Sequence, residues 1–284
     1  YGMRATGSEV VGLLPLRSLL EAGRHYLAKQ GRSAGVSESE LIKIAVKSMG
    51  LDELAPFDPA QKVIECRLRS AQEAKLAQLS VRAFAEEVAS ESMAPGGGSV
   101  AANLGALGAA LGTMVANLSA NKKGWEGRCA EFSLLAEQGQ ALLRDLLAAV
   151  DADTQAFNAI LAAGRLPKGT PAEQAARSLA QAQAQQRAIE VPLTVMRLSV
   201  EALELLVKVA EQGNPASVTD AGVGALAAHA AVRGARLNVD VNIRDLSDAA
   251  QIERYALACS GLGNRAQALE AMVLERVKRV LAGA

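Results

Sequence analysis

The chain has 284 residues, with 30 basic and 30 acidic side chains that cancel to a formal net charge of zero. Without a net field to attract polyanions, we expect no nucleic-acid partner and no attachment to an anionic membrane. Cys66, Cys129 and Cys259 lie far apart without CxxC spacing, which predicts free core thiols and a reducing, cytoplasmic setting. Only His25 and His229 are present, and neither lies in a ligand-like cluster, so we expect no metal site.

The first seventy residues have a mixed pattern. Residues 8–14 and 62–68 are predicted to form short strands, and residues 16–29 and 37–49 to form helices. We therefore expect a small α/β segment over residues 1–70. Two strands make a thin sheet, and the chain opens at Tyr1 just before the first of them, so we expect further parts of this domain upstream.

A second region of different composition follows. Residues 71–78 are charged and alanine-rich, which indicates a helical connector. From residue 79 to residue 284, Ala, Leu, Gln and Glu dominate, and Pro and Gly fall mostly where helices should begin or end. The sequence thus predicts a mainly α protein, in which a small α/β remnant precedes an all-α helical bundle domain.

A glycine-rich turn opens this second domain. Gly96, Gly97 and Gly98 follow Pro95 and precede Ser99. In one interpretation, bare backbone N–H groups at the start of a helix favour a bound carboxylate or phosphate. In the other, the glycines only make a tight turn and let Ser99 cap the helix.

The stretch from Val100 to Ala120 is uncharged and long enough to raise the question of a membrane span. It is mostly Ala and Gly and poor in the residues that drive insertion, so we expect a helix packed within the protein. Two stripes share that helix: one of larger apolar side chains (Val100, Leu104, Leu107, Leu111 and Met114) and one of small residues (Ala101, Gly105, Gly108, Gly112 and Ala116). Both faces can be buried, and the small one allows close approach of a backbone or a flat ligand.

A helix around residues 135–160 is predicted to carry one carboxylate on its apolar face. At about 100° per residue, Asp153 lies in the middle of a narrow face formed by Leu135, Gly139, Leu142, Leu146, Ala149, Phe157 and Ile160. Loss of hydration raises the pKa of such a group, which makes Asp153 the acid/base candidate. The alternative is a structural ion pair with an Arg or Lys of a neighbouring helix. Asp151 points the opposite way and is predicted to be a solvated surface charge.

Residues 170–212 are predicted to form one long helix. Thr170, Pro171 and Glu173 make a helix start whose parts reinforce one another. Pro192 is expected to bend the helix. Apolar residues then recur at steps of four and three, as in a packed bundle: Ile189, Leu193, Met196, Val200, Leu203, Val207 and Ala210.

Polar residues gather in two later segments. Asn214 and Asp220 flank a helix boundary, where capping alone explains them. Asn238 and Asn242 share a face, and their amides suit donor and acceptor contacts to a heterocycle. His229, within an alanine-rich helix, is interpreted as a packing residue.

These motifs together resemble a known family. Residues 79–84, 94–102, 151–157, 166–168, 213–214 and 238–242 are similar to the cyclodeaminase domain of formiminotransferase-cyclodeaminase, in that family's order. Residues 7–16, 56–59 and 62–65 resemble the end of its formiminotransferase domain. The part of the transferase that carries the family's catalytic histidine has no counterpart, so we expect only the second activity to be complete.

The resemblance implies conversion of 5-formiminotetrahydrofolate to 5,10-methenyltetrahydrofolate and ammonia, with no metal or redox cofactor. Asp153 matches the family's functional aspartate, and the expected folate-binding residues are Gly96, Gly97, Gly98, Ser99, Lys123, Asn214, Asp220, Asn238 and Asn242. Lys123 would meet the glutamate tail of a folate, polyglutamylated or not, and the domain would form a homo-oligomer. Two alternatives stay open: a methenyltetrahydrofolate cyclohydrolase on the same scaffold, and a folate-binding oligomerisation domain without catalysis.

Overall fold

The computed structural model describes residues 7–69 and 76–283 and divides the chain into two compact units. The first unit contains the N-terminal residues together with residues 116–140, and the second contains residues 75–115 and 141–284. Residues 116–140 therefore group with the N-terminal part, although they follow the predicted domain boundary near residue 79. Of the predicted connector over residues 71–78, residues 71–75 lie outside the described part, and Leu76–Gln78 form a 3₁₀ turn, η1.

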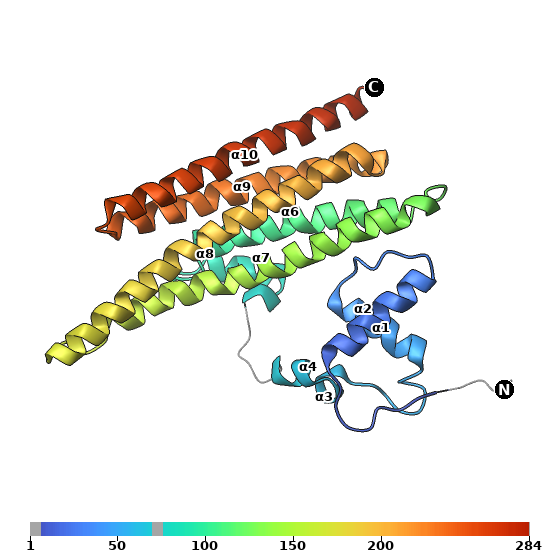
Figure 1. The fold of residues 1–284 in the computed structure, drawn as a ribbon, viewed down its shortest axis with the longest axis horizontal. Helices are drawn as coiled ribbons and strands as arrows, with labels where there is room; N and C mark the ends of the chain where they lie inside the picture. Colours follow the sequence, from blue (N-terminus) through green and yellow to red (C-terminus); the bar gives the residue numbers. More distant parts are fainter. Residues whose placement is uncertain (1–6, 70–75, 284) are drawn as a thin grey trace. The chain divides into compact units, whose positions relative to one another are not determined.

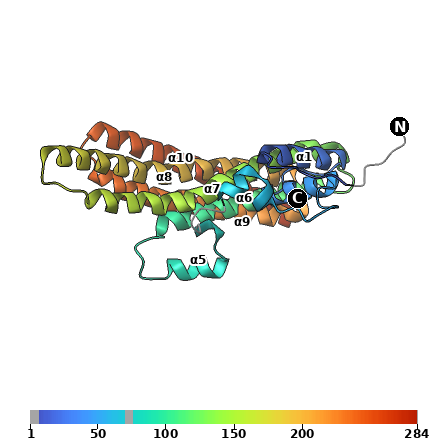
Figure 2. The ribbon, with the colours of Figure 1, turned by 90° about the horizontal axis from the view of Figure 1, so that it is seen from below.

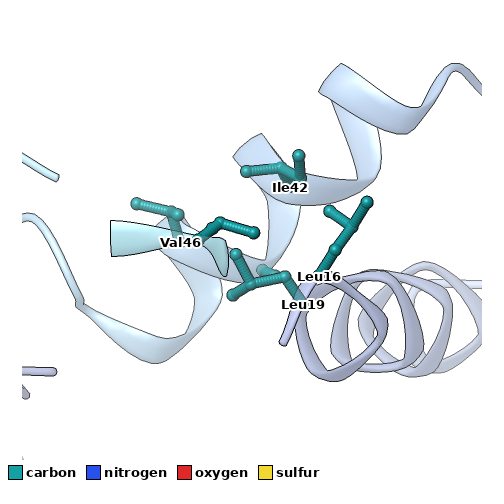
Figure 3. Packing of buried hydrophobic residues seen from close by; sticks show 6 residues of the cluster. Leu16, Leu19, Ile42 and Val46 are labelled. Carbon is teal, nitrogen blue, oxygen red and sulfur yellow. The ribbon is translucent and has the colours of Figure 1, made fainter. Parts of the chain in front are cut away.

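The N-terminal unit is built on two helices, α1 (Leu16–Lys29) and α2 (Glu38–Met49), which agree with the two helices predicted there. Their facing side chains form a small core (Figure 3). Leu16 and Leu19 of α1 pack in it with Ile42 and Val46 of α2. Two short helices, α3 (Pro59–Lys62) and α4 (Ile64–Arg69), complete the described N-terminal segment.

The two predicted strands are not formed. A single parallel bridge joins Leu14 to Val63, and most of the second predicted strand belongs to α3 and α4. Helix α3 begins because Asp58 accepts a hydrogen bond from Ala60 and Pro59 fits the first helical turn. Glu65, on α4, accepts a hydrogen bond from the backbone N–H of Leu16 at 2.7 Å and so caps α1. The α/β character predicted for this segment is therefore reduced to one bridge.

The second unit is a bundle of long helices (Figure 1). Its members are α6 (Gly97–Ala120), α7 (Cys129–Gly164), α8 (Pro171–Gln212), α9 (Val218–Asn242) and α10 (Ala249–Leu281); the end of α6 and the start of α7 belong to the first unit. Short connections reverse the chain between successive helices, as in an up-and-down bundle. One of them contains the short turn η2 (Glu126–Arg128), and the later ones contain η3 (Pro215–Ser217) and η4 (Ile243–Asp245). Figure 2 shows α5 (Val81–Val88) beside the bundle, ahead of the segment that leads into α6.

The longest helix confirms two predictions. Thr170 Oγ1 accepts a hydrogen bond from the Glu173 N–H, and the Glu173 carboxylate accepts one from the Thr170 N–H, so the predicted capping box starts α8. All seven apolar residues predicted to recur along α8 are buried, from Ile189 to Ala210. The assigned helix continues through Pro192, which is buried.

The small-residue stripe of α6 lets neighbouring helices approach closely, as predicted, with Gly108 facing α9, Gly112 facing α8 and Gly105 meeting α7, α8 and α9. A Cβ added to Gly108 would lie 2.9 Å from the Cβ of Ala228 and 2.9 Å from the Gly224 carbonyl oxygen, so only glycine fits this contact. By length and composition, α6 is the one helix of the described residues that could cross a membrane. Within the protein, 61 % of its most apolar window is buried, which is how a core helix behaves.

Candidate active site

The candidate site is centred on Asp153 of α7, whose carboxylate reaches the first turn of α6. Ser99 donates its hydroxyl to Asp153 Oδ2 over 3.0 Å, and the backbone N–H of Ser99 donates to the same carboxylate. A Cβ on Gly98 would overlap Asp153 Oδ1, so this approach requires glycine. The glycine turn thus binds a carboxylate, as one interpretation of the sequence proposed, but the carboxylate belongs to the protein itself.

Ser99 links two helices and does not cap its own. It is fully buried, and its hydroxyl lies 2.9 Å from the Val150 carbonyl oxygen and 3.3 Å from Thr154 Oγ1, both on α7. The interpretation of Ser99 as a helix cap is therefore wrong. The single hydroxyl proton of Ser99 is shared between the Val150 carbonyl and the Asp153 carboxylate, and both contacts join α6 to α7.

Burial raises the pKa of Asp153, and the two hydrogen bonds from Ser99 oppose that rise. Among the described residues, no Arg or Lys forms an ion pair with Asp153, so the structural ion pair considered from the sequence is not formed there. A half-buried carboxylate with a raised pKa and no cation is suited to exchange protons with a bound molecule.

Asp153 opens onto a cavity of about 310 Å³ within the helical bundle. Gly96, Gly97 and Gly98 form one side, and Asn238 and Asn242 of α9 form another. The remaining wall is apolar or backbone and comes from Met93, Ala94, Ala156, Phe157, Ile160, Ala188 and Val241. Six of the residues predicted for the site, including the predicted acid/base group, therefore meet in one cavity.

Both asparagine amides are held by backbone carbonyls. Asn238 Nδ2 donates to the Gly234 oxygen at 2.9 Å, and Asn242 Nδ2 donates to the Ala188 oxygen at 2.8 Å. Because the opposite amide orientation would set oxygen against oxygen, each Nδ2 is fixed toward its carbonyl, which leaves the side-chain oxygen and the second N–H of each amide for other contacts.

Comparison with known proteins identifies the family. Residues 80–260 match the family described as formiminotransferase-cyclodeaminase, and residues 1–69 match the formiminotransferase domain. The chain belongs to the formiminotransferase-cyclodeaminase family. This confirms the resemblance found in the sequence.

Several relatives of this family member are similar over most of its length. The formimidoyltransferase-cyclodeaminase of Rattus norvegicus is 37 % identical over 269 residues, which are 94 % of this chain and 50 % of the rat protein. The chain thus spans about half the length of the curated relatives of that name. A methenyltetrahydrofolate cyclohydrolase of Methylorubrum extorquens is 39 % identical over 199 residues, covering 70 % of this chain and 96 % of that protein. The crystal structure of formiminotetrahydrofolate cyclodeaminase from Thermotoga maritima superposes with a TM-score of 0.60 at 28 % identity, covering 74 % of this chain and 98 % of that one.

Three residues predicted for folate binding in this family member do not line the cavity. Asn214 caps the turn η3 by accepting a hydrogen bond from Ala216, and Asp220 lies in the first turn of α9. Asp220 and Asn238 are 18 residues apart on one helix, which is about 27 Å along its axis. Lys123 follows the C-terminal end of α6, whereas the glycine turn begins that helix. Their proposed contacts with folate stay predictions.

Other polar residues singled out in the sequence have structural partners. His229 Nδ1 lies 2.8 Å from a carboxylate oxygen of Glu270, and this partner supports its interpretation as a satisfied packing residue, although His229 also lines a cavity of about 470 Å³ between α9 and α10. Asp151 is half-buried and accepts a hydrogen bond from Leu76 at 2.7 Å, so it is not the solvated charge expected from the sequence. The three cysteines are in no disulfide, and only Cys259 is buried, so the prediction of three core thiols holds for Cys259 alone. Within the described residues, no three His, Cys, Asp or Glu side chains group as metal ligands.

Sequence reasoning missed two kinds of site residue. Thr154, which contacts Ser99, is the neighbour of Asp153 in the chain, but nothing local indicates its partner. Ala188, on α8, and Met93, in the segment ahead of α6, also line the cavity. Neither residue type has a polar or ionisable group that would indicate a site in the sequence. Phe157 and Ile160 were placed on the correct face of α7 by periodicity, without being recognised as cavity walls.

Proposed function

We propose that this protein is a formimidoyltetrahydrofolate cyclodeaminase, which converts 5-formiminotetrahydrofolate to 5,10-methenyltetrahydrofolate and ammonia. The observation that carries the proposal is the desolvated Asp153 carboxylate, fixed at the start of α6 and facing a cavity. The likeness to the Thermotoga maritima cyclodeaminase, over nearly all of that protein's length, supports the same activity.

The reaction needs one proton to be moved. In the protonated formimino group, the carbon bonded to N5 is electrophilic, and the N10 lone pair attacks it to form a tetrahedral carbon. N10 then gives up its proton. The former imino nitrogen, which is now an amine, gains a proton and leaves as ammonia. As it leaves, the lone pairs of N5 and N10 stabilise the carbon as the methenyl bridge. One carboxylate can accept the first proton and donate it again, so the cycle consumes no external proton. No electrons are transferred, so the proposed reaction calls for no redox cofactor.

Asp153 fits this role because its pKa is raised above that of an exposed aspartate. Burial raises this pKa, and the Ser99 hydrogen bonds partly oppose the rise. A carboxylate of this kind is a stronger base, and it can accept the proton of N10 and then return it to the leaving nitrogen. In the proposal, the glycine turn and the oxygens of Asn238 and Asn242 hold the folate in the cavity, and Lys123, Asn214 and Asp220 keep their predicted roles outside it.

Cyclohydrolysis of methenyltetrahydrofolate is the second candidate, because the 39 % identical Methylorubrum extorquens relative bears that name. The match of residues 1–69 to the formiminotransferase domain favours the deaminase, since that domain accompanies a cyclodeaminase in the family's name. In this proposal, cyclodeamination and cyclohydrolysis would use the same cavity and the same proton-transfer group. An assay with each substrate is therefore needed to tell the two activities apart.

The decisive experiment incubates the purified protein with 5-formiminotetrahydrofolate and follows methenyl absorbance and ammonia together. Cyclodeaminase activity gives both products in equal amounts, and Asp153→Asn should abolish them in a folded protein. Asp145→Asn on the exposed side of the same helix is the matched control and should retain activity. A protein that hydrolyses methenyltetrahydrofolate but releases no ammonia would instead be the cyclohydrolase. A folded protein that turns over neither substrate would contradict catalysis and leave the non-catalytic alternative.

We further propose that a second copy of the chain covers an apolar face formed by α6 and α9. Figure 1 shows these helices side by side, and the glycine contact at Gly108 joins them. Large apolar side chains remain exposed there: Leu107 by 52 % on α6, and Val223 by 57 %, Leu226 by 50 % and Leu237 by 71 % on α9. Helix α6 carries no charge over its 24 residues, whereas α9 adds one exposed arginine, Arg233, between Leu226 and Leu237. A largely apolar face of this kind can be buried against the same face of a second copy in a twofold dimer.

The oligomer is tested by light scattering during size exclusion. The wild type should be at least dimeric, and Leu226→Glu should shift it to monomer because a buried carboxylate without a partner is costly. Leu257→Glu, at a 66 % exposed leucine of α10, is the matched control and should leave the assembly intact. A monomeric wild type, or an unchanged mass for Leu226→Glu, would contradict the proposed interface.

A further inference from the structure

Pro192 of α8 leaves one backbone carbonyl of the cavity wall without its normal partner. In an α-helix, the N–H of residue 192 would donate to the carbonyl oxygen of residue 188, but proline has no N–H. Ala188 lines the cavity and is buried, so its oxygen needs another donor. Asn242 provides it, through Nδ2 at 2.8 Å.

The same residue is also held through its backbone. The carbonyl oxygen of Asn242 lies at the C-terminal end of α9, where helix carbonyls lack intrahelical donors, and Gln185 Nε2 donates to it. Gln185 and Ala188 lie one turn apart on α8, so α8 fixes both the main chain and the side chain of Asn242. One N–H of Nδ2 is used in this way, so the amide has Oδ1 and its second N–H left for a bound molecule.

Asn238 repeats this arrangement one helical turn earlier, at about 6 Å along α9. Its Nδ2 donates to the Gly234 oxygen at 2.9 Å, which again leaves Oδ1 for other contacts. Two acceptors on one cavity wall suit a ligand edge that carries more than one N–H donor. In a reduced pterin, the N3–H and the 2-amino group form such an edge.

We propose that Pro192 is a positioning residue, whose missing N–H frees the Ala188 carbonyl to orient Asn242, and that Asn242 and Asn238 accept hydrogen bonds from the N–H edge of the pterin ring. The inference rests on the proposed folate substrate and deepens it, because it states which edge of the ring enters the cavity beside α9. Asp153, on α7, then remains for the reacting nitrogen atoms.

Binding of 5-formyltetrahydrofolate, which carries a formyl group in place of the reacting formimino group, tests the inference without turnover. Asn242→Ala should weaken binding about tenfold, the loss expected for one well-placed hydrogen bond. Pro192→Ala restores a helical N–H that competes for the Ala188 oxygen, and it should weaken binding about threefold to tenfold. In the Asn242→Ala background, Pro192→Ala should have no further effect, because the proline acts through Asn242.

A ligand variant and a control variant make the test specific. The 2-desamino-2-methyl analogue of 5-formyltetrahydrofolate lacks the amino donor. The wild type should bind this analogue more weakly than 5-formyltetrahydrofolate. The double variant Asn238→Ala, Asn242→Ala should show a smaller difference in affinity between the two ligands. Pro167→Ala, at an exposed proline between α7 and α8, should leave binding unchanged. Equal effects of Pro192→Ala with and without Asn242, or full discrimination in the double alanine variant, would overturn the inference.

A second measurement needs no folate. In nitrogen-15 spectra, the side-chain amide of Asn242 should shift and exchange with solvent faster in Pro192→Ala than in the wild type. An unchanged amide signal would overturn the role of Pro192. A wild type that binds no folate while the amide signal responds as expected would contradict the proposed function and retain the positioning relation.

Discussion

Replacing Gly98 by alanine tests the placement of the Asp153 carboxylate most directly. An added Cβ would overlap Oδ1 of Asp153 and crowd its Cγ, so the carboxylate has to move away from α6. Restoring an ordinary contact requires a displacement of about 1 Å or more, and a misplacement of that size costs roughly 100-fold in rate. We therefore expect Gly98→Ala to lower kcat for cyclodeamination by about two orders of magnitude.

The same substitution should affect stability much less than activity. Alanine is favoured over glycine within a helix by up to about 1 kcal/mol. Loss of the charge-assisted hydrogen bond between Ser99 and Asp153, now 3.0 Å, costs about 1.5 to 3 kcal/mol. The difference is a net destabilisation of about 0.5 to 2 kcal/mol, which leaves the protein folded at room temperature.

The assay combines ammonia release with urea unfolding and includes Gly261→Ala as the matched control. A Cβ at Gly261, on α10, meets no atom within 4 Å, so this variant should gain up to about 1 kcal/mol of stability and keep full activity. If Gly98→Ala is folded and retains wild-type kcat, the carboxylate does not need its place against the first turn of α6, and its role as positioned acid/base is refuted.

Three further predictions concern the same helices. Ser99→Ala removes a hydrogen bond that lowers the pKa of Asp153, so the acid limb of the pH profile of kcat/KM should move to higher pH. An acid limb at unchanged pH would show that the ionisation of Asp153 does not control the rate. Because the pKa of Asp153 is raised on folding, the native state binds more protons just above the pKa of an unfolded aspartate, and wild-type stability falls as pH rises through that window. Urea unfolding from pH 4 to pH 7 should therefore show Asp153→Asn gaining stability relative to the wild type; a pH-independent difference would contradict the raised pKa. Gly108→Ala should lower the free energy of unfolding by about 1 to 3 kcal/mol, because the added methyl group overpacks the contact with α9. Adding Ala228→Gly should restore part of the lost stability. If Gly108→Ala is as stable as the wild type, α6 does not pack closely on α9 at this position.

The sequence predicted those parts of the fold that depend on local chemistry. The start of α8 depends on Thr170 and Glu173, which are three residues apart and meet in any helix that begins there. The strand predicted over residues 62–68 had suitable residue types, but a strand also needs partners, and only Leu14 pairs with Val63. Asp58 and Pro59 start helix α3, which takes up Lys62, and residues 64–68 belong to α4.

The site shows the same division between local and distant information. Asp153 was found because helix periodicity fixes which face of α7 it shares, whichever helices surround it. That its carboxylate would meet Gly98 and Ser99 was not predictable, since 54 residues separate Ser99 from Asp153 and only packing brings them together. Polarity grouped Asn214 and Asp220 with Asn238, but Asp220 lies about 27 Å from Asn238 along α9, and Asn214 precedes that helix.

The use of the α6 terminus by Asp153 determines what else the cavity can hold. Helix N-termini favour anions, and here the carboxylate of Asp153 already lies at the terminus and accepts a hydrogen bond from the Ser99 N–H. A second anion, such as the glutamate tail of a folate, would be repelled by the charge of that carboxylate. The apolar walls formed by Phe157 and Ile160 suit the opposite end of the molecule, the uncharged and donor-rich ring. Occupation of the helix terminus by the protein's own carboxylate therefore supplies the acid/base group and also orients the proposed substrate, with its ring inward and its tail directed out of the cavity.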